Sequence, residues 1–437
     1  MSIRQRVVAG MCVGLLICAG AAAAAISSPF VGAQIDVDTI VRDLAMGIRN
    51  NYVFPDKGED AAKMLEENLD GGRYESLSDM ELSQRLTLDL RELTEDRHFG
   101  VRPAPQRDET EVEVTFTGQP SGTFGFQHIE RLEGNIGYMD LREFAPRAVA
   151  EPTLHAAMRL LQGSDALIFD LRKNGGGDPE TIQVLCTYLF DPDEPVHLNS
   201  LYFRPSDETT EFWTQPEVLE SDAMPETPVW VLTSGYTFSG GEEFAYNLKT
   251  QQRATLIGET TGGGAHPVDG FLLEGGSHLA MIPVGRAINP ITGTNWEGVG
   301  VSPHVEAPAD EALDIAIDQA LEGMAGSDDP DKAGQAEWAL TAIRAKRGGQ
   351  PVSEAVMIEI AGDYGERQIE MRDGALWYSR KGVSNGQRKL TCVGEDAFVV
   401  EGVAGFKLEF RRDDDGRIDG VTGNYKMRGP DFNEREG

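Results

Sequence analysis

The chain has 437 residues, and its 40% of hydrophobic residues is ordinary for a globular protein with room for two or three domains. Its formal net charge of −33 at pH 7 would repel nucleic acid and anionic lipid, so neither is expected as a partner. The four cysteines are too few for a disulfide framework, and their spacing matches no metal-ligand motif.

The first 25 residues have the features of a secretory signal peptide. Arg4 and Arg6 precede the apolar stretch "VVAGMCVGLLICAGAAAAA", and small residues lead to a cleavage point near Ala25. We therefore expect a secreted or periplasmic protein with no stable membrane insertion after the signal is removed. A retained anchor is the alternative, because the apolar run is nearly long enough to span a bilayer. Cys186 and Cys392 lie beyond this stretch and are expected to be small buried hydrophobic residues.

Residues 35–104 are predicted to form an N-terminal helical domain. Its apolar residues recur at helical spacing, and the turn "YVFPD" ends the first helix at Pro55. Ser78 with Glu81 makes a capping box ahead of a run of leucines, which predicts the start of another helix.

Residues 105–325 are predicted to form an α/β core. Helical stretches such as 147–162 and 240–252 alternate with short strand-like runs. Strands that alternate with helices favour a sheet buried between helical layers. The strand-like runs are "VEVTF", "NIGYMDL", "ALIFDL", "VWVLT", "ATLIGE" and "LAMIPVG".

Residues 326–349 are predicted to be a linker, followed by a small β domain over 350–437. Asp-Gly pairs at Asp373 and Asp415 are typical of hairpin turns, so a barrel or a sandwich is expected. The segments "AGDY" and "LEFRRDDDGRIDGV" resemble the lipocalin-like modules that follow some hydrolases.

The stretch "LTSGYTFSGGEEFAYNLK" carries Ser239 from the end of a strand to the start of a helix. Ser239 is either the cap of that helix or a nucleophile, and a nucleophile needs a base and an oxyanion hole. His98 and His266 are the competing bases. The loop in "IFDLRKNGGGDP" could bind an oxyanion or a phosphate, or be a simple turn, and Glu297 in "NWEGVGVSPH" could be catalytic or merely solvated.

The order of several motifs resembles one family. "NYVFP", "LTEDRHFGV", "DLRKNGGG", "TSGYTFSGGEEFA", "GETTGGGAHP" and "WEGVGVSPH" follow one another as in the C-terminal processing (tail-specific) serine proteases. The chain is most similar to the branch that contains the tricorn protease core and the interphotoreceptor retinoid-binding protein modules. The resemblance covers residues 35–308 and implies a crotonase-like core of β-β-α units capped by the N-terminal helices.

The resemblance also implies a role for each matching position. Ser239 matches the nucleophile, His98 the base, and Glu297 the acid that sets and polarises the histidine. Gly240 and Gly176 match the two oxyanion-hole donors. No metal or organic cofactor is implied.

Three features of the sequence depart from the family pattern. Gly263 stands where the Ser–Lys members carry lysine, so a Ser–Lys dyad is excluded and His98 is needed. The segment 101–122 is too short for a PDZ-like insertion, and His304 stands where aspartate is usual.

We therefore expect a serine endopeptidase that cleaves peptide bonds through a Ser239–His98–Glu297 relay and an acyl-enzyme. The alternatives are a non-catalytic module that binds apolar ligands or peptides, and a hydrolase of non-peptide esters or amides. His266 and Glu259 remain substitutes for the base and the acid, and the oligomeric state is left open.

Overall fold

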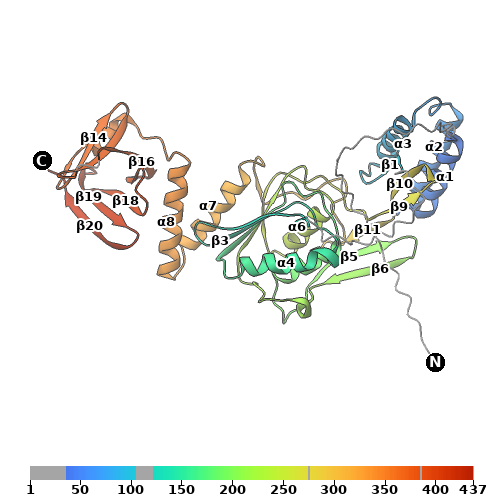
Figure 1. Cartoon of the computed structure of the whole chain (residues 1–437), viewed down its shortest axis with the longest axis horizontal. Helices are drawn as coiled ribbons and strands as arrows, with labels where there is room; N and C mark the ends of the chain where they lie inside the picture. The colour runs from blue at the N-terminus through green and yellow to red at the C-terminus, as the bar shows by residue number, and fades with distance from the viewer. Residues whose placement is uncertain (1–35, 105–121, 274–275, 384–385, 437) are drawn as a thin grey trace, which may run out of the picture. The chain divides into compact units, whose positions relative to one another are not determined.

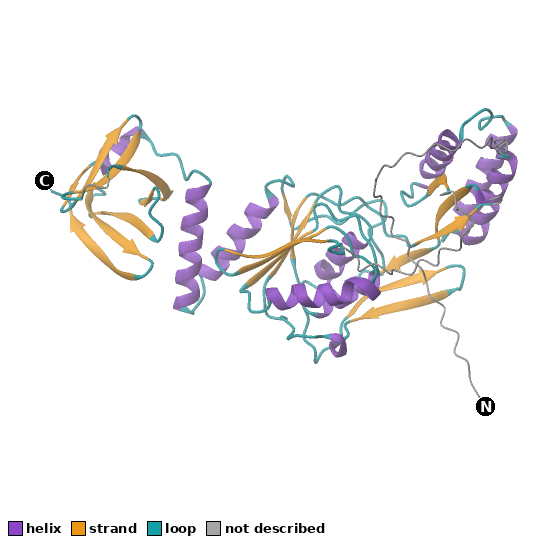
Figure 2. Ribbon diagram, viewed as in Figure 1, coloured by secondary structure: helices purple, strands orange, loops and turns teal. Residues whose placement is uncertain are grey.

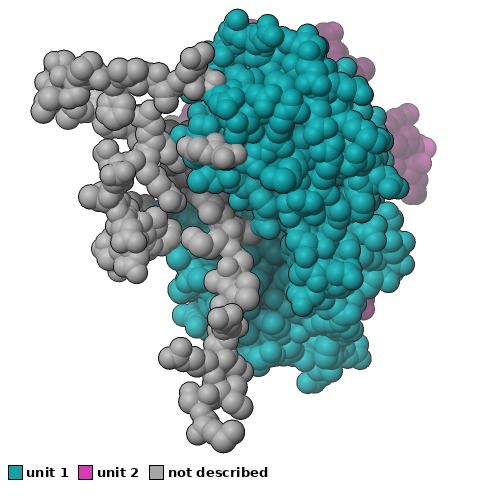
Figure 3. All heavy atoms as spheres, turned by 90° about the vertical axis from the view of Figure 1, so that its right-hand side faces the viewer, with its two compact units in different colours: residues 1–132, 136–316 teal, residues 133–135, 317–437 magenta. Residues whose placement is uncertain are grey.

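The computed structural model describes residues 36–104, 122–273, 276–383 and 386–436. The chain divides into two compact units (Figures 1 and 3). The first unit contains Met1–Leu132 and Ile136–Ala316, and the second contains Glu133–Asn135 and Ile317–Gly437. The expected signal peptide, residues 1–25, and the expected strand "VEVTF" lie outside the described residues.

A six-stranded sheet lies at the centre of the first unit, and Figure 1 labels its strand β3. The strand order is β12-β8-β7-β4-β3-β2. Its strands pair in parallel, except that β2 runs antiparallel to β3. Every residue of β4 is buried, as expected for a parallel strand that is covered on both faces. The strands are β2 (Phe126–Leu132), β3 (Ile136–Leu141), β4 (Ala166–Asp170), β7 (Val229–Thr233), β8 (Thr255–Gly258) and β12 (Val305–Glu306).

Helices α4 (Arg147–Leu161), α5 (Pro179–Thr187) and α6 (Gly240–Thr250) pack beside one another and share a core with this sheet. In that core, Phe169 of β4 meets Phe244 of α6 edge to face, with ring centroids 5.4 Å apart. The predicted alternation of strands and helices thus builds a mixed α/β unit (Figure 2).

Three helices precede the α/β region: α1 (Val37–Asn51), α2 (Pro55–Asp70) and α3 (Asp79–Thr94). The first helix ends before Pro55, as predicted. The capping box is confirmed, because Ser78 N donates to the Glu81 carboxylate at 2.9 Å and Glu81 N donates to Ser78 Oγ at 3.4 Å.

These helices do not close a core by themselves. They pack on a three-stranded sheet, β1-β10-β9, made of β1 (Gly100–Pro103), β9 (Val268–Leu272) and β10 (His278–Pro283). The run "LAMIPVG", expected in the α/β core, instead forms most of β10, which pairs antiparallel with β1. Ile282 of β10 is buried with Leu44 and Ile48 of α1, so the strand covers an apolar face of the helices.

A second three-stranded antiparallel sheet, β11-β5-β6, completes the first unit. Its strands are β5 (His197–Phe203), β6 (Glu208–Trp213) and β11 (Gly285–Ile288), and the short helix η1 (Pro216–Val218) follows β6. Helix α7 (Ala312–Ala325) contains the boundary between the two units.

The second unit is dominated by one eight-stranded antiparallel sheet whose strands follow chain order from β13 to β20. Asp373 and Gly374 join β14 to β15 with φ of 51° and 69°, the geometry of a two-residue hairpin turn. The N–H of Glu436 donates to the carbonyl of Asp363 in β13 at 2.8 Å, so the last residues approach the first strand. The elements are α8 (Pro330–Lys346), α9 (Glu354–Ile360), β13 (Gly362–Tyr364), β14 (Arg367–Arg372), β15 (Ala375–Arg380), β16 (Arg388–Gly394), β17 (Ala397–Val400), β18 (Phe406–Arg412), β19 (Ile418–Tyr425) and β20 (Arg428–Glu434).

Within the residues that the structure describes, no helix is both long enough and apolar enough to cross a membrane.

Glu243, in the first turn of α6, is an ionisable residue inside the α/β core. Burial raises the pKa of its carboxyl to about 7, an effect that the Asn199 amide of β5 opposes and the charge of Asp178 reinforces. The thiol of Cys186 on α5 is buried in the same region, and burial raises its pKa as well.

This burial predicts a stability that falls as pH rises. The folded carboxyl of Glu243 keeps its proton to about pH 7, whereas the unfolded carboxyl loses it near 4.5. Its contribution is therefore complete below pH 4.5 and is lost as pH approaches 7, by about 3 kcal/mol in total. The free energy of unfolding, compared between the unmodified chain and Glu243→Gln from pH 4.5 to 7, measures this loss. Equal pH slopes in the two proteins would contradict this assignment.

Candidate active site

Three loops meet at the carboxyl edge of the parallel sheet. The glycine-rich loop follows β4, the turn that carries Ser239 follows β7, and the segment 259–266 follows β8. Because β8, β7 and β4 are neighbours and parallel, their carboxyl ends lie at one edge. This edge of an open α/β sheet is where such proteins commonly bind ligands.

Ser239 occupies a backbone conformation that few residues other than glycine adopt. Its φ is 53° and its ψ is −119°, and α6 begins at the next residue, Gly240. Such strain persists only where surrounding contacts impose it, and it is common at functional sites. The turn also leaves Ser239 at the positive end of the α6 dipole. Among the described residues, the Gly240 N–H forms no intramolecular hydrogen bond.

Glu242 imposes the conformation of the serine turn. Its completely buried carboxylate accepts hydrogen bonds from Ser239 N at 2.9 Å and Gly264 N at 2.8 Å through one oxygen. The other oxygen accepts from Thr261 Oγ1 at 2.5 Å and Gly263 N at 2.7 Å. Burial raises the pKa of Glu242, while these four hydrogen bonds oppose the rise. The carboxylate therefore joins the serine turn to the loop after β8.

The glycine-rich loop lies directly against the serine turn. A Cβ on Gly176, whose φ is 104°, would come within 2.8 Å of both Ser239 Cβ and Gly240 N, so only glycine permits this approach. The Gly176 N–H, expected as an oxyanion donor, donates to Asn174 Oδ1 at 2.8 Å. In contrast, the Gly177 N–H makes no hydrogen bond to any described residue. The sequence did not single out Asn174 or Gly177.

His98 reaches this edge from the loop between α3 and β1. Its ring packs on Phe238, the residue before Ser239, with ring centroids 4.8 Å apart. The side chain is only 8% exposed, and neither ring nitrogen has a hydrogen-bond partner in the described part of the chain. Within the described chain, no hydrogen bond therefore joins Ser239 to His98, although such bonds often tighten only when substrate binds.

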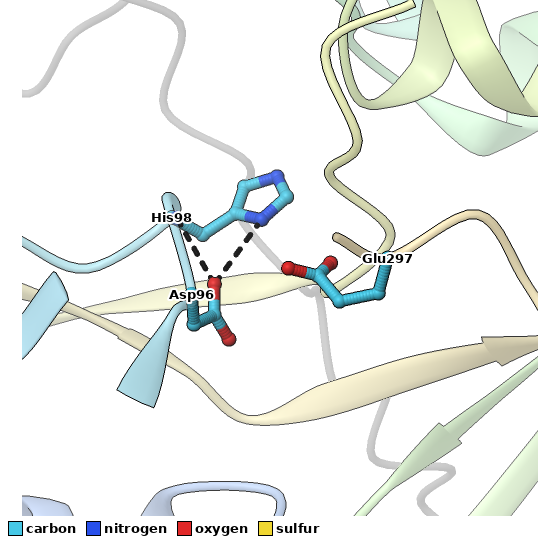
Figure 4. A group of neighbouring side chains, drawn as sticks. All are labelled: Asp96, His98 and Glu297. Carbon is cyan, nitrogen blue, oxygen red and sulfur yellow. Dashed lines mark hydrogen bonds and ion pairs between the residues drawn. The ribbon is translucent and has the colours of Figure 1, made fainter. Parts of the chain in front are cut away.

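Asp96 is a buried carboxylate beside both histidines that sequence reasoning missed. One of its oxygens accepts the backbone N–H of His98 at 3.0 Å and lies 3.6 Å from His98 Nδ1 (Figure 4). The other oxygen is 2.6 Å from His266 Nδ1. Burial alone would raise the pKa of Asp96, but His266 and His98 together hold it below its ordinary value. The spacing Asp-x-His in "EDRHF" was the available signal.

Glu297 lies beside this cluster. Its Oε2 accepts the N–H of Ala265 at 2.5 Å and lies 3.5 Å from His266 Nδ1, whereas Oε1 is buried without a partner among the described residues. Burial raises the pKa of Glu297, the charge of His266 opposes the rise, and Asp96 adds to it. The Trp296 indole N–H donates to Gly264 O at 2.6 Å and holds this segment on the loop after β8.

Glu259 and His304, which the sequence analysis also considered, make their hydrogen bonds with backbone groups outside this cluster. Glu259 accepts the backbone N–H groups of Gly235 at 3.0 Å and Ala309 at 3.2 Å. His304 Nδ1 accepts the N–H of Leu256 at 2.9 Å, and burial lowers its pKa. Both side chains therefore hold backbone segments together.

A cavity of about 570 Å³ opens beside the cluster. Asp96, His266 and Glu297 line it together with the cationic side chains of Lys57 and Arg286. The cavity gives small molecules and ions a route to the carboxylates.

The four hydrogen bonds of Glu242 predict the effect of removing its charge. In Glu242→Gln, the amide NH₂ group would face two of the donors that the carboxylate accepts, and the free energy of unfolding should fall by about 2 kcal/mol. Hydrogen exchange of α6 and residues 261–264 measures this change within the first unit. Glu259→Gln is the control, because the carboxylate of Glu259 accepts only two backbone N–H groups among the described residues, and it should show a smaller change in protection. Unchanged protection in Glu242→Gln would contradict the proposed anchoring role.

The chain resembles known peptidases in sequence and fold. Residues 135–307 match the model of peptidase family S41, and residues 32–124 match the N-terminal domain of peptidase S41 described for eukaryotic IRBP. A carboxyl-terminal-processing protease of Synechocystis sp. is 32% identical over 149 residues, which are 34% of this chain and 32% of that protein. A carboxy-terminal-processing protease of Bartonella bacilliformis is 28% identical over 189 residues, 41% of each chain. The chain thus spans less than half the length of these relatives.

A solved structure from Parabacteroides merdae, described as a candidate peptidase, supports the fold. It superimposes with a TM-score of 0.50 and 18% identity, over 66% of this chain and 98% of that one. Because residues 135–307 and 32–124 match two models of peptidase family S41, the family resemblance inferred from the motifs is confirmed. The chain belongs to peptidase family S41.

Proposed function

We propose that this chain is a secreted or periplasmic serine endopeptidase in which Ser239 is the nucleophile. The observation that carries the proposal is the strained turn of Ser239 at the start of α6, which packs against the glycine-rich loop. The ring of His98 packs on Phe238, the residue directly before Ser239. A nucleophile, a histidine and a carboxylate cluster at one sheet edge are the parts that acyl transfer requires. The core would then be of the crotonase-like type that the motif order implies.

In the proposed reaction, Ser239 Oγ attacks the carbonyl carbon of the scissile bond while His98 accepts the serine proton. The C–N bond breaks as His98 returns that proton to the leaving amine, and water then hydrolyses the acyl-enzyme. Glu297 and Asp96 stabilise the positive charge that develops on the imidazole. Asp96 is the acid nearer to His98 Nδ1, and Glu297 acts beside it.

Backbone N–H groups would stabilise the oxyanion. Gly240 supplies one donor, since its N–H forms no hydrogen bond within the described chain. The glycine-rich loop supplies the second. Gly177 is available there, whereas Gly176 would first have to leave Asn174. Each such donor contributes about 3 kcal/mol to transition-state stabilisation in serine peptidases. No residue beyond about 350 is needed for this chemistry.

Labelling tests the nucleophile directly. A fluorophosphonate probe should modify Ser239, and peptide mapping should recover the label on the segment that contains it. Ser239→Ala should abolish labelling and lower kcat for peptide hydrolysis on the order of 10⁶-fold, the loss typical of a missing nucleophile. A folded protein that takes no label and hydrolyses nothing would favour the binding module, and hydrolysis of esters but not peptides would favour a non-peptide hydrolase.

Two matched carboxylate variants test the acid. Glu297→Gln should lower kcat on the order of 100-fold, because acid–base catalysis contributes about 10²–10⁴-fold and Asp96 still supports the histidine. Glu259→Gln should leave kcat near that of the unmodified protein, since the carboxylate of Glu259 accepts the backbone N–H groups of Gly235 and Ala309. The reverse result, an active Glu297→Gln and a crippled Glu259→Gln, would assign the acid to Glu259.

A further inference from the structure

Three buried polar atoms of the candidate site have no hydrogen-bond partner within the described chain. They are both ring nitrogens of His98 and Oε1 of Glu297. Buried polar atoms in proteins nearly always have a partner, and a missing one points to an unseen water, ion or ligand. A serine hydroxyl can satisfy one nitrogen of His98, which still leaves Nδ1 and the carboxylate oxygen.

The same atoms converge with a second carboxylate. One ligand atom each from Asp96, His98 and Glu297 lies within 4.8 Å of the others. Figure 4 shows the carboxylates of Asp96 and Glu297 on the side of the His98 ring that carries Nδ1. The Asp96 Oδ1 to His98 Nδ1 distance is 3.6 Å. Two ligands of a tetrahedral zinc ion with bonds of about 2.0–2.1 Å are separated by about 3.4 Å, so this pair is nearly spaced for a metal.

Neighbouring groups orient both carboxylates. Asp96 Oδ2 lies 2.6 Å from His266 Nδ1, which leaves Oδ1 directed at His98. Glu297 Oε2 accepts the Ala265 N–H, which leaves Oε1 as its ligand atom. Contacts of this kind fix metal ligands and strengthen binding in known metal sites. The cavity that Asp96, His266 and Glu297 line provides the entry path.

From these contacts we propose that Asp96, His98 and Glu297 form a binding site for a zinc-type divalent cation that regulates the active site. An imidazole with two carboxylates suits zinc and its first-row neighbours better than magnesium or calcium, which prefer oxygen ligands alone. Three protein ligands leave the fourth position to water.

Cation binding and catalysis exclude each other at His98. With the cation on Nδ1, the neutral ring carries its proton on Nε2, so the ring cannot accept the proton of Ser239. The cation also occupies the two carboxylates that would stabilise the imidazolium. This inhibitory effect rests on the proposed peptidase function, whereas the binding itself does not.

Calorimetric titration of Ser239→Ala with Zn²⁺ tests the binding without any activity. One Zn²⁺ should bind per chain, and Co²⁺ should bind in its place with the visible absorption of mixed nitrogen and oxygen ligands. Adding Glu297→Gln or His98→Gln to Ser239→Ala should weaken Zn²⁺ binding on the order of 100-fold, the upper end of what supporting groups alone contribute. Unfolding without metal checks that both double variants remain folded.

Matched controls separate this site from surface binding. Glu259→Gln changes a carboxylate that holds two backbone groups, and His128→Gln removes the exposed imidazole that lies 3.2 Å from Glu130. Neither should alter Zn²⁺ affinity. Affinity that is unchanged in the Glu297 and His98 variants, or lost only in His128→Gln, would overturn the proposal.

Measuring peptide hydrolysis with and without Zn²⁺ distinguishes the metal-site proposal from the peptidase proposal. Zn²⁺ should inhibit peptide hydrolysis by the unmodified protein, and a chelator should restore it. If Ser239→Ala binds Zn²⁺ as expected while the unmodified protein hydrolyses no peptide, the metal site stands and the peptidase proposal fails. Hydrolysis without any Zn²⁺ binding would remove the metal site and leave the peptidase.

Discussion

The buried carboxylate of Glu242 is the interaction on which the arrangement of the site depends. It accepts two donors on each oxygen, and these donors belong to the serine turn and to the loop after β8. A buried charge is tolerable only when its lone pairs are satisfied, so each of these hydrogen bonds helps to offset the cost of burial. That mutual dependence holds Ser239 at a positive φ that its own backbone would otherwise avoid.

The cluster of Asp96, His98, His266 and Glu297 joins two parts of the first unit that are far apart in the chain. Asp96 and His98 follow the helices packed on β1 and β10, whereas His266 and Glu297 belong to segments held on the edge of the large sheet. Asp96 is shared by the two histidines, and Arg97 Nη1 donates to Gly262 O at 2.6 Å to reinforce the junction. Small shifts between these parts would change the distance from His98 to the serine.

Local patterns predicted much of the secondary structure. The helices before residue 100, the alternating strands and helices, and the Asp-Gly hairpin at Asp373 appear where period, caps and turn residues indicate. The strand "LAMIPVG" was assigned to the wrong sheet, because β10 pairs with β1 across about 180 residues of sequence. Pairing between such distant strands depends on which apolar faces remain uncovered after the helices pack, and periodicity carries no information on that choice.

The sequence by itself determined which residue types could perform the chemistry. Glycines beside Ser239, a histidine ending the helical region and the order of the motifs identified the family without coordinates. Only the tertiary structure decided how these groups are paired. It brought Asp96 closer than Glu297 to His98 Nδ1, gave Glu259 a backbone-holding role, engaged the Gly176 N–H with Asn174, and made Glu242 the anchor of the turn. The physical reason is that hydrogen bonds form within about 3 Å, and loops distant in sequence reach that range only after strand order and core packing have positioned them.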